Sequence, residues 1–183
     1  MKNSFLLLLT GLSLTSLTSM AQQKNITSFE TLCVSGGGDI EVFYSKGPTL
    51  EIKGEESCIN KIGIAQSSGT LSITVHENCK KPTQIFIGTP SLKRINQKGG
   101  GNIEIKKGFG TFIALSCTVR GGGNTKVLDS INFLSASVYG GGTLSAHVNK
   151  LLEGKVSDGG SIFYKGTAVV KSNILDGGVI KKL

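Results

Sequence analysis

The sequence predicts an all-β fold, a right-handed parallel β-helix (a solenoid) whose coils take about 18–22 residues each. Two observations predict it. A glycine-rich signature returns after 22, 19, 18 and 18 residues, and alternating apolar and polar residues lead into and out of each copy. The copies begin at Gly99, Gly121, Gly140, Asp158 and Asp176. An earlier copy begins at Gly36, 63 residues before Gly99, and we expect it to lie about three coils away.

The strand that leads into each copy predicts a narrow interior. Alternate residues of a strand share a face, so three columns of side chains point the same way. The pattern large, small, large fits a close-packed core in which small residues leave room for large ones. The large columns hold Leu115, Leu134, Leu152 and Val170, and Val119, Val138, Val156 and Ile174; the small column holds Cys117, Ala136, Gly154 and Ser172. The residues between these columns are polar and predict a solvated face.

The glycines predict sharp corners that need a positive φ or a close backbone approach. A second alternating strand follows each corner. The fifth residues of the copies, counted from the first residue of each, form a further column: Ile40, Ile103, Thr125, Leu144, Ile162 and Ile180. A phosphate-binding loop would open a helix instead, so P-loop and dinucleotide-binding functions are excluded. Asp158 and Asp176 share one corner position, where they either hold a cation or accept hydrogen bonds from their own turns.

Residues 1–21 are interpreted as a secretory signal peptide, with a basic start at Lys2, an apolar stretch over 5–17 and small residues before Gln22. No Cys stands at the expected cleavage site, so we expect no lipid anchor there, and no other segment is long and apolar enough to span a membrane. The exported chain is periplasmic, on the cell surface or secreted, and residues 22–183 form a single domain.

The net charge of +8 falls to +7 with the signal peptide, because Lys2 is the one charged residue removed. Export makes nucleic acid an unsuitable partner. A glycan, an envelope component or another protein is the expected partner, and the scattered lysines are interpreted as a solvated coat that aids solubility.

Residues 24–92 form a less regular opening section, and residues 93–183 form the regular coils. Strands are expected at 39–44, 49–53, 62–65, 70–76 and 83–88. Turn residues separate the first pair at 45–48 and the second pair at 67–69, which predicts hairpins. The section is three degenerate coils, a small antiparallel sheet that caps the solenoid, or a mixture of the two.

Four cysteines lie in the exported chain, and export favours disulfides. Cys117 belongs to the small interior column and is interpreted as a buried free thiol. Cys58 and Cys79 both lie in polar loop sequence, and we predict that they form a disulfide.

No residues in the sequence predict catalysis, a cofactor or a metal site. His76 and His147 stand alone in their neighbourhoods, no CxxC pair or Cys/His cluster occurs, and the absence of Trp removes the usual platform for stacking sugars. We therefore expect that the protein is not an enzyme.

These residues resemble the head GIN domain family, described as auto-transporter adhesins and common in secreted proteins of Bacteroidetes. The resemblance rests on Phe29–Val34 before Gly36–Ile40, and on Pro90–Ile95 leading into repeated Gly-x-Gly-x-Ile strands, and it covers residues 25–183. It implies an exported, largely parallel β-helix with an adhesive role and no catalytic residues. The full Gly-Gly-Gly corners and the four cysteines depart from the family pattern.

We expect an exported binding or adhesion module of the cell envelope whose ligand and oligomeric state the sequence leaves open. One alternative is a structural envelope protein that assembles through its strand edges or faces, and a further one is a polysaccharide-active enzyme. Arg120 and Tyr139 precede successive corners, so we expect them to be neighbours. They either contact an anionic or sugar-like ligand or pack together as a surface cation–π pair.

Overall fold

The computed structural model describes residues 20–76 and 83–183. They form an all-β protein, a single curled sheet of 15 strands with one short helix, α1 (Glu56–Ile59). The strands are β1 (Met20–Lys24), β2 (Thr31–Gly36), β3 (Asp39–Tyr44), β4 (Thr49–Gly54), β5 (Gly63–Ser67), β6 (Thr70–Val75), β7 (Gln84–Thr89), β8 (Arg94–Lys98), β9 (Asn102–Ile105), β10 (Phe112–Arg120), β11 (Asn124–Tyr139), β12 (Thr143–Ser157), β13 (Ser161–Lys165), β14 (Val169–Ile174) and β15 (Val179–Lys182).

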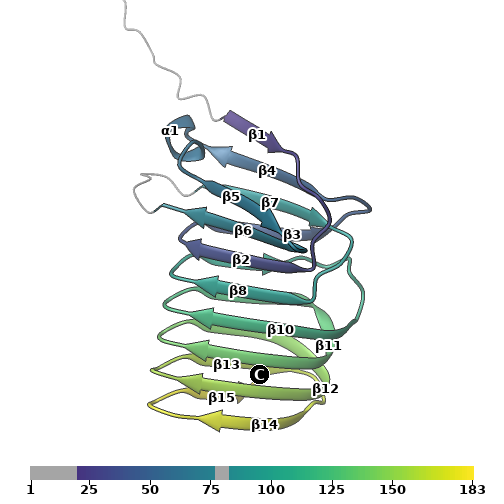
Figure 1. Ribbon diagram of the computed structural model, residues 1–183. Coiled ribbons are helices and arrows are strands. Elements are labelled where there is room, and N and C mark those ends of the chain that lie inside the picture. Colours follow the sequence, from purple (N-terminus) through teal and green to yellow (C-terminus); the bar gives the residue numbers. More distant parts are fainter. Residues whose placement is uncertain (1–19, 77–82) are drawn as a thin grey trace, which may run out of the picture.

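The sheet is folded into two ladders of stacked strands. The first ladder runs β1-β4-β7-β3-β9 and continues through the first halves of β11 and β12 to β13 and β15. The second runs β5-β6-β2-β8-β10 and continues through the second halves of β11 and β12 to β14. Figure 1 shows β2, β8 and β10 of the second ladder stacked with their arrowheads at the same side. The long strands β11 and β12 belong to both ladders and join them.

The predicted interior columns are confirmed in register. Leu115 lies opposite Leu134, which lies opposite Leu152, and the small column stacks Cys117 on Ala136 on Gly154. Because these residues are buried, they face the space between the two ladders. A Cβ added to Gly154 would lie 2.6 Å from Ile180 Cδ1, on the first ladder. The two inward faces therefore pack against each other as one apolar core.

The glycine corners adopt the positive φ and the close backbone approach that the sequence predicts. Gly99, Gly121 and Gly140 have φ values of 102°, 96° and 82°, which favour glycine. A Cβ on Gly121 would lie 3.0 Å from Gly99 O, so successive corners also approach too closely for a side chain. Asp158 and Asp176 adopt positive φ at the same position, each followed by a glycine that does so too, as in the tight turns that Asp-Gly pairs favour.

One expectation about the repeat is wrong. The Gly36 corner is not about three coils from Gly99 but lies directly against it, since β2 pairs with β8 and β3 pairs with β9. The intervening chain instead extends the stack beyond β2 and β3, where β6 pairs with β2 and β7 pairs with β3. Order along the chain and order in the stack therefore differ in the opening section.

The opening section is a mixture of parallel and antiparallel strands. β6 and β7 add parallel strands to the stack, whereas β1, β4 and β5 pair antiparallel at its end. The hairpin expected around 67–69 is confirmed, because Ser67 pairs with Thr70 across Ser68 and Gly69, both at positive φ. The hairpin expected around 45–48 is wrong, because β7 lies between β3 and β4.

On β14, the last strand of the second ladder, the interior columns are less buried than the repeat predicts. Ser172 and Ile174 of β14 are exposed although they continue the columns of Gly154 and Val156. β14 pairs only with β12, and β15 only with β13, among the strands of the described residues. The large–small–large pattern thus fixes which way a side chain points. Burial also requires a neighbouring strand of the ladder on both sides.

The segment interpreted as a signal peptide lies outside the described residues up to position 19. Met20 and Ala21 are described, as the first residues of β1. No helix in the described part of the chain is long and apolar enough to cross a membrane.

Candidate functional site

An apolar column runs along the outside of the second ladder, at the side where the sheet bends. Ala114, Phe133, Leu151 and Val169 lie opposite one another on four successive strands, β10, β11, β12 and β14. Phe133 is 43% exposed and Val169 is 67% exposed, whereas the neighbouring outward column is polar, with Ser116, Ser135, Glu153 and Lys171. The outer face therefore changes from polar to apolar at the bend.

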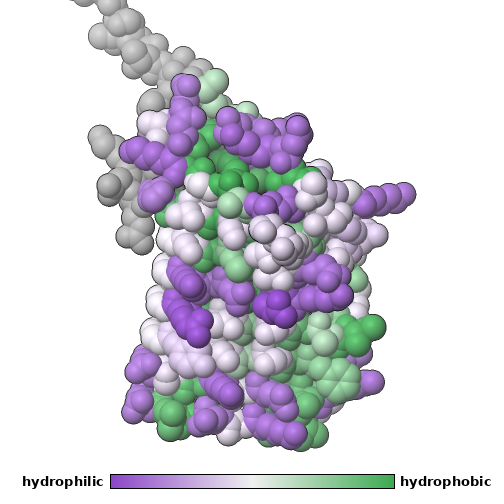
Figure 2. Space-filling view, viewed as in Figure 1, coloured by the Kyte–Doolittle hydropathy of each residue, from purple (hydrophilic) through white to green (hydrophobic). Residues whose placement is uncertain are grey.

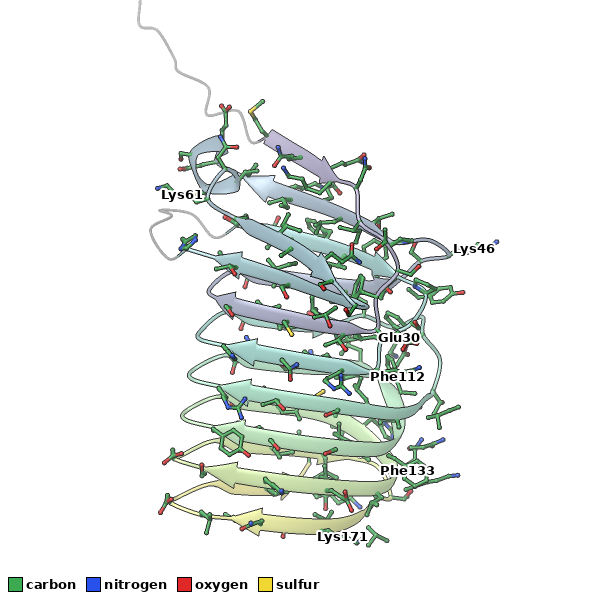
Figure 3. The ribbon with its side chains drawn as sticks, viewed as in Figure 1. Glu30, Lys46, Lys61, Phe112, Phe133 and Lys171 are labelled. Atoms are coloured by element: carbon green, nitrogen blue, oxygen red, sulfur yellow. The ribbon has the colours of Figure 1, made fainter. Side chains whose placement is uncertain are left out.

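This column borders an apolar groove of about 640 Å³. Residues that are far apart in the chain form it, from the loop before β8, the loop before β10 and the strands β10, β11 and β12. The apolar residues that line it include Leu92, Phe109, Phe112, Ile113, Phe133 and Leu151. Figure 2 shows hydrophobic surface over this side of the molecule, and Figure 3 places Phe112 and Phe133 there.

Asp129 holds one wall of the groove in place. Its Oδ2 accepts backbone hydrogen bonds from Gly108 at 2.9 Å and from Phe109 at 2.7 Å. The loop that these bonds fix carries Phe109, whose ring packs against Phe112 at 5.2 Å and edge-on against Tyr44 at 5.9 Å. The aromatic wall is thus built before any ligand arrives.

A β-bulge places a cation beside the groove. Ile131 pairs with Val148 and Phe133 pairs with Leu151, so β12 uses one more residue than β11 over this step. The extra length brings Lys150 next to Phe133, with Nζ 5.6 Å from the ring centroid. At the groove rim, Lys93 pairs with Glu30 at 2.8 Å and Glu153 pairs with Lys171 at 3.5 Å. Lys150 forms no ion pair with a described carboxylate.

Sequence reasoning missed this groove although part of its signal lies in the repeat. The interior columns predicted from the sequence begin six residues before each corner, at Leu115 and its equivalents. The next column back holds Ala114, Phe133, Leu151 and Val169. Two adjacent apolar columns put apolar side chains on both faces of the strand, which marks an exposed patch beside the core.

The expected neighbours Arg120 and Tyr139 do lie side by side. They are partners in the register of β10 and β11, and the guanidinium carbon of Arg120 is 5.1 Å from the Tyr139 ring centroid. This is the geometry of a cation–π pair on the surface. Neither residue lines the apolar groove. Their contact with a ligand stays a prediction.

The cysteines divide into two kinds. Cys33 and Cys117 are free thiols, and Cys117 is buried as expected, which raises the pKa of its thiol to about 12. Cys58 does not lie in a loop, as its polar neighbours in the sequence suggested; it lies in α1 and is buried. With Cys33 and Cys117 free, Cys58 and Cys79 are the one pair left among the four cysteines. Cys79 lies outside the described residues, so their disulfide stays a prediction.

The described residues offer little for metal or acid–base chemistry. No group of three or more His, Cys, Asp or Glu side chains within residues 20–76 and 83–183 is placed to hold a metal ion. Asp158 Oδ2 accepts a hydrogen bond from the Ser157 hydroxyl at 2.6 Å, within its own corner. His147 is exposed at the end of the first ladder's section of β12.

The fold and the groove together define an all-β protein with an apolar, aromatic-lined surface site. A family model described as "Putative auto-transporter adhesin, head GIN domain" matches residues 28–109 and 105–168. The chain belongs to this family, as the resemblance in its sequence implied. The family is one of adhesin-like, exported or cell-surface proteins, and membership implies that the chain binds a partner. No curated protein matches the chain.

One solved structure shows a similar fold, and two others are more distant. A putative adhesin from Bacteroides fragilis is 21% identical, with a TM-score of 0.61, over 92% of this chain and 98% of that chain. A putative adhesin from Parabacteroides merdae is 14% identical, with a TM-score of 0.41, over 90% and 96% of the two chains. A putative lipid binding protein from Parabacteroides distasonis is 18% identical, with a TM-score of 0.42, over 90% and 96%.

Proposed function

We propose that this chain is an exported binding module of the cell envelope that holds its partner through the apolar groove and does not catalyse a reaction. The observation that carries the proposal is the exposed apolar column of Phe133 and its neighbours beside a hollow of about 640 Å³. Hollows of this size lined by aromatic and aliphatic side chains are typical of binding sites for small apolar groups. Large exposed apolar patches are otherwise costly to a soluble protein.

The groove needs a rigid support, and the sheet supplies one. We propose that residues 22–183 form a single domain, a right-handed parallel solenoid that export releases from residues 1–21. The parallel pairing of successive strands in both ladders supports this description. Sites on strands hold their geometry better than sites on free loops.

The test uses a neutral apolar dye, Nile red, whose fluorescence rises on entering an apolar site. We expect the purified protein to bind it saturably, and Phe133→Ser and Ile113→Ser to weaken binding roughly tenfold or more. Val179→Ser is the matched control, because Val179 is 42% exposed on β15, outside the groove. Equal dye binding by all three variants and the parent protein would disprove the groove as the site.

A second candidate function is self-assembly through strand edges, and the last rung favours it. Exposed apolar residues on β14 and β15 and in the segments that follow them are Val169 (67%), Ile174 (46%), Leu175 (56%), Val179 (42%) and Leu183 (64%). An edge strand with exposed apolar side chains is a template for pairing with another chain. Sedimentation of the protein over a hundredfold range of concentration tests this function. The oligomers should grow with concentration, and Ile174→Lys should abolish them.

A further inference from the structure

We propose that the apolar groove binds a single alkyl chain that carries an anionic head group, with the head group beside Lys150. This inference rests on the proposed function and names the chemical class of the ligand. Three features of the described residues carry it: the line of apolar side chains, the recessed floor and the charge balance at the rim.

The apolar side chains form a line. Ala114, Phe133 and Leu151 line the groove on three successive strands, and Val169 continues the line onto β14. Strands in a ladder are spaced about 4.8 Å apart, so the line is about 14 Å long. A long, narrow apolar strip of this kind matches an extended alkyl chain better than a compact ring or a sugar, which needs hydrogen-bonding partners along its edges.

The floor of the groove is recessed. Leu92 and Phe112 line it and are almost fully buried, at 3% and 8% exposure. Ile113, in contrast, stands out at 78% exposure on the wall. A chain taken from solution reaches the floor and the wall together, whereas a flat bilayer surface meets only the projecting side chains.

The charge balance favours an anion. Lys93 and Glu153 at the rim are neutralised by Glu30 and Lys171. Lys150 has a ring contact with Phe133 and no carboxylate partner among the described residues. One positive charge beside an apolar strip complements an anionic amphiphile. The same positive charge opposes a second copy of this chain as occupant, because each exported copy, without Lys2, carries a net charge of +7.

The experiment titrates the purified protein with octanoate, decanoate and dodecanoate, each below its micelle concentration, and with dodecanol, by calorimetry or by displacement of Nile red. We expect affinity to rise about fourfold for each added methylene until the strip is filled. Lys150→Gln should raise the Kd of dodecanoate about two- to fivefold and leave that of dodecanol unchanged. Lys126→Gln, an exposed lysine on the first ladder, is the control.

Affinity that does not depend on chain length would overturn the inference, as would equal effects of Lys150→Gln on dodecanoate and dodecanol. Binding to vesicles of anionic phospholipid without binding of monomeric dodecanoate would replace it with a membrane-surface site. In each of these cases Nile red still binds in the groove and the proposed function stands. Loss of the Nile red signal itself is the failure of the proposed function.

Discussion

At the scale of single residues, the environment of each side chain decides its chemistry more than its type does. Cys117 and Cys33 are both free thiols, yet Cys117 is 1% exposed inside the core and Cys33 is half-buried on the outer face, where it accepts a hydrogen bond from Asn96 Nδ2 at 3.5 Å. Burial disfavours the thiolate, and the pKa of Cys117 rises to about 12 for that reason.

The first prediction follows from that pKa. The folded-state value lies above the unfolded value of about 8.5, so the stability linked to Cys117 is complete below about pH 8.5 and is lost as the pH rises towards 12. Between pH 8 and pH 10 the unfolding free energy of the parent protein should fall by about 2 kcal/mol more than that of Cys117→Ala. Urea unfolding of both proteins at pH 8 and pH 10 measures this. If the unfolding free energies of the parent protein and Cys117→Ala fell equally with pH, the burial of the thiol would be contradicted.

The second prediction concerns the disulfide. If Cys58 and Cys79 are linked, the bridge closes a loop of about 20 residues, and losing it costs about 2–4 kcal/mol. Peptide mapping of the unreduced protein should recover the two cysteines in one linked fragment. Four free thiols in the native protein would rule the bridge out.

The third prediction keeps Arg120 and Tyr139 as a second contact point. We propose that a glycan or an anionic envelope group binds over the pair, because an Arg beside a phenol ring offers charge-assisted hydrogen bonds and stacking. An array of envelope and host glycans should then show binding that Arg120→Ala and Tyr139→Ala abolish without a change in melting temperature. Unaltered binding by both variants would assign the pair to surface packing alone. Turnover of an array glycan would overturn the expectation that the protein is not an enzyme.

At the scale of elements, the repeat predicted register correctly wherever each coil follows the last in the chain. Leu115, Leu134 and Leu152 stack as expected because one coil length separates them and parallel neighbours keep side chains in line. The Gly36 corner was misplaced because the chain between β3 and β8 adds its strands to the far side of β2 and β3. Sequence spacing measures chain length and not order in a stack.

The fourth prediction tests the inward register. Gly154→Leu should destabilise the protein by about 1–3 kcal/mol or more, because a Cβ at this position would already lie 2.6 Å from Ile180 Cδ1. Ser135→Leu, on the exposed outer column, should cost little. Thermal melts of the two variants decide the matter, and equal losses would mean that the inside and outside assignments are wrong.

At the scale of the whole molecule, the all-β character of the fold was predictable from the sequence and the groove was not. The groove draws on the loops before β8 and β10 and on three strands, and the loop before β10 is fixed by Asp129 from β11. The β12 bulge that brings Lys150 to Phe133 has no signature in the glycine spacing. Regular columns in the sequence do not predict which side chains loops and bulges bring together.

We propose that the groove, rather than the corner beside Arg120 or the exposed end of the stack at β14 and β15, receives the ligand. Amide chemical shifts of isotopically labelled protein, followed while dodecanoate is added, test it most directly. The largest shifts should fall on Phe112–Ala114, Phe133 and Lys150–Leu151. Shifts confined to Arg120 and Tyr139 or to β14 and β15, with the groove residues unmoved, would contradict it.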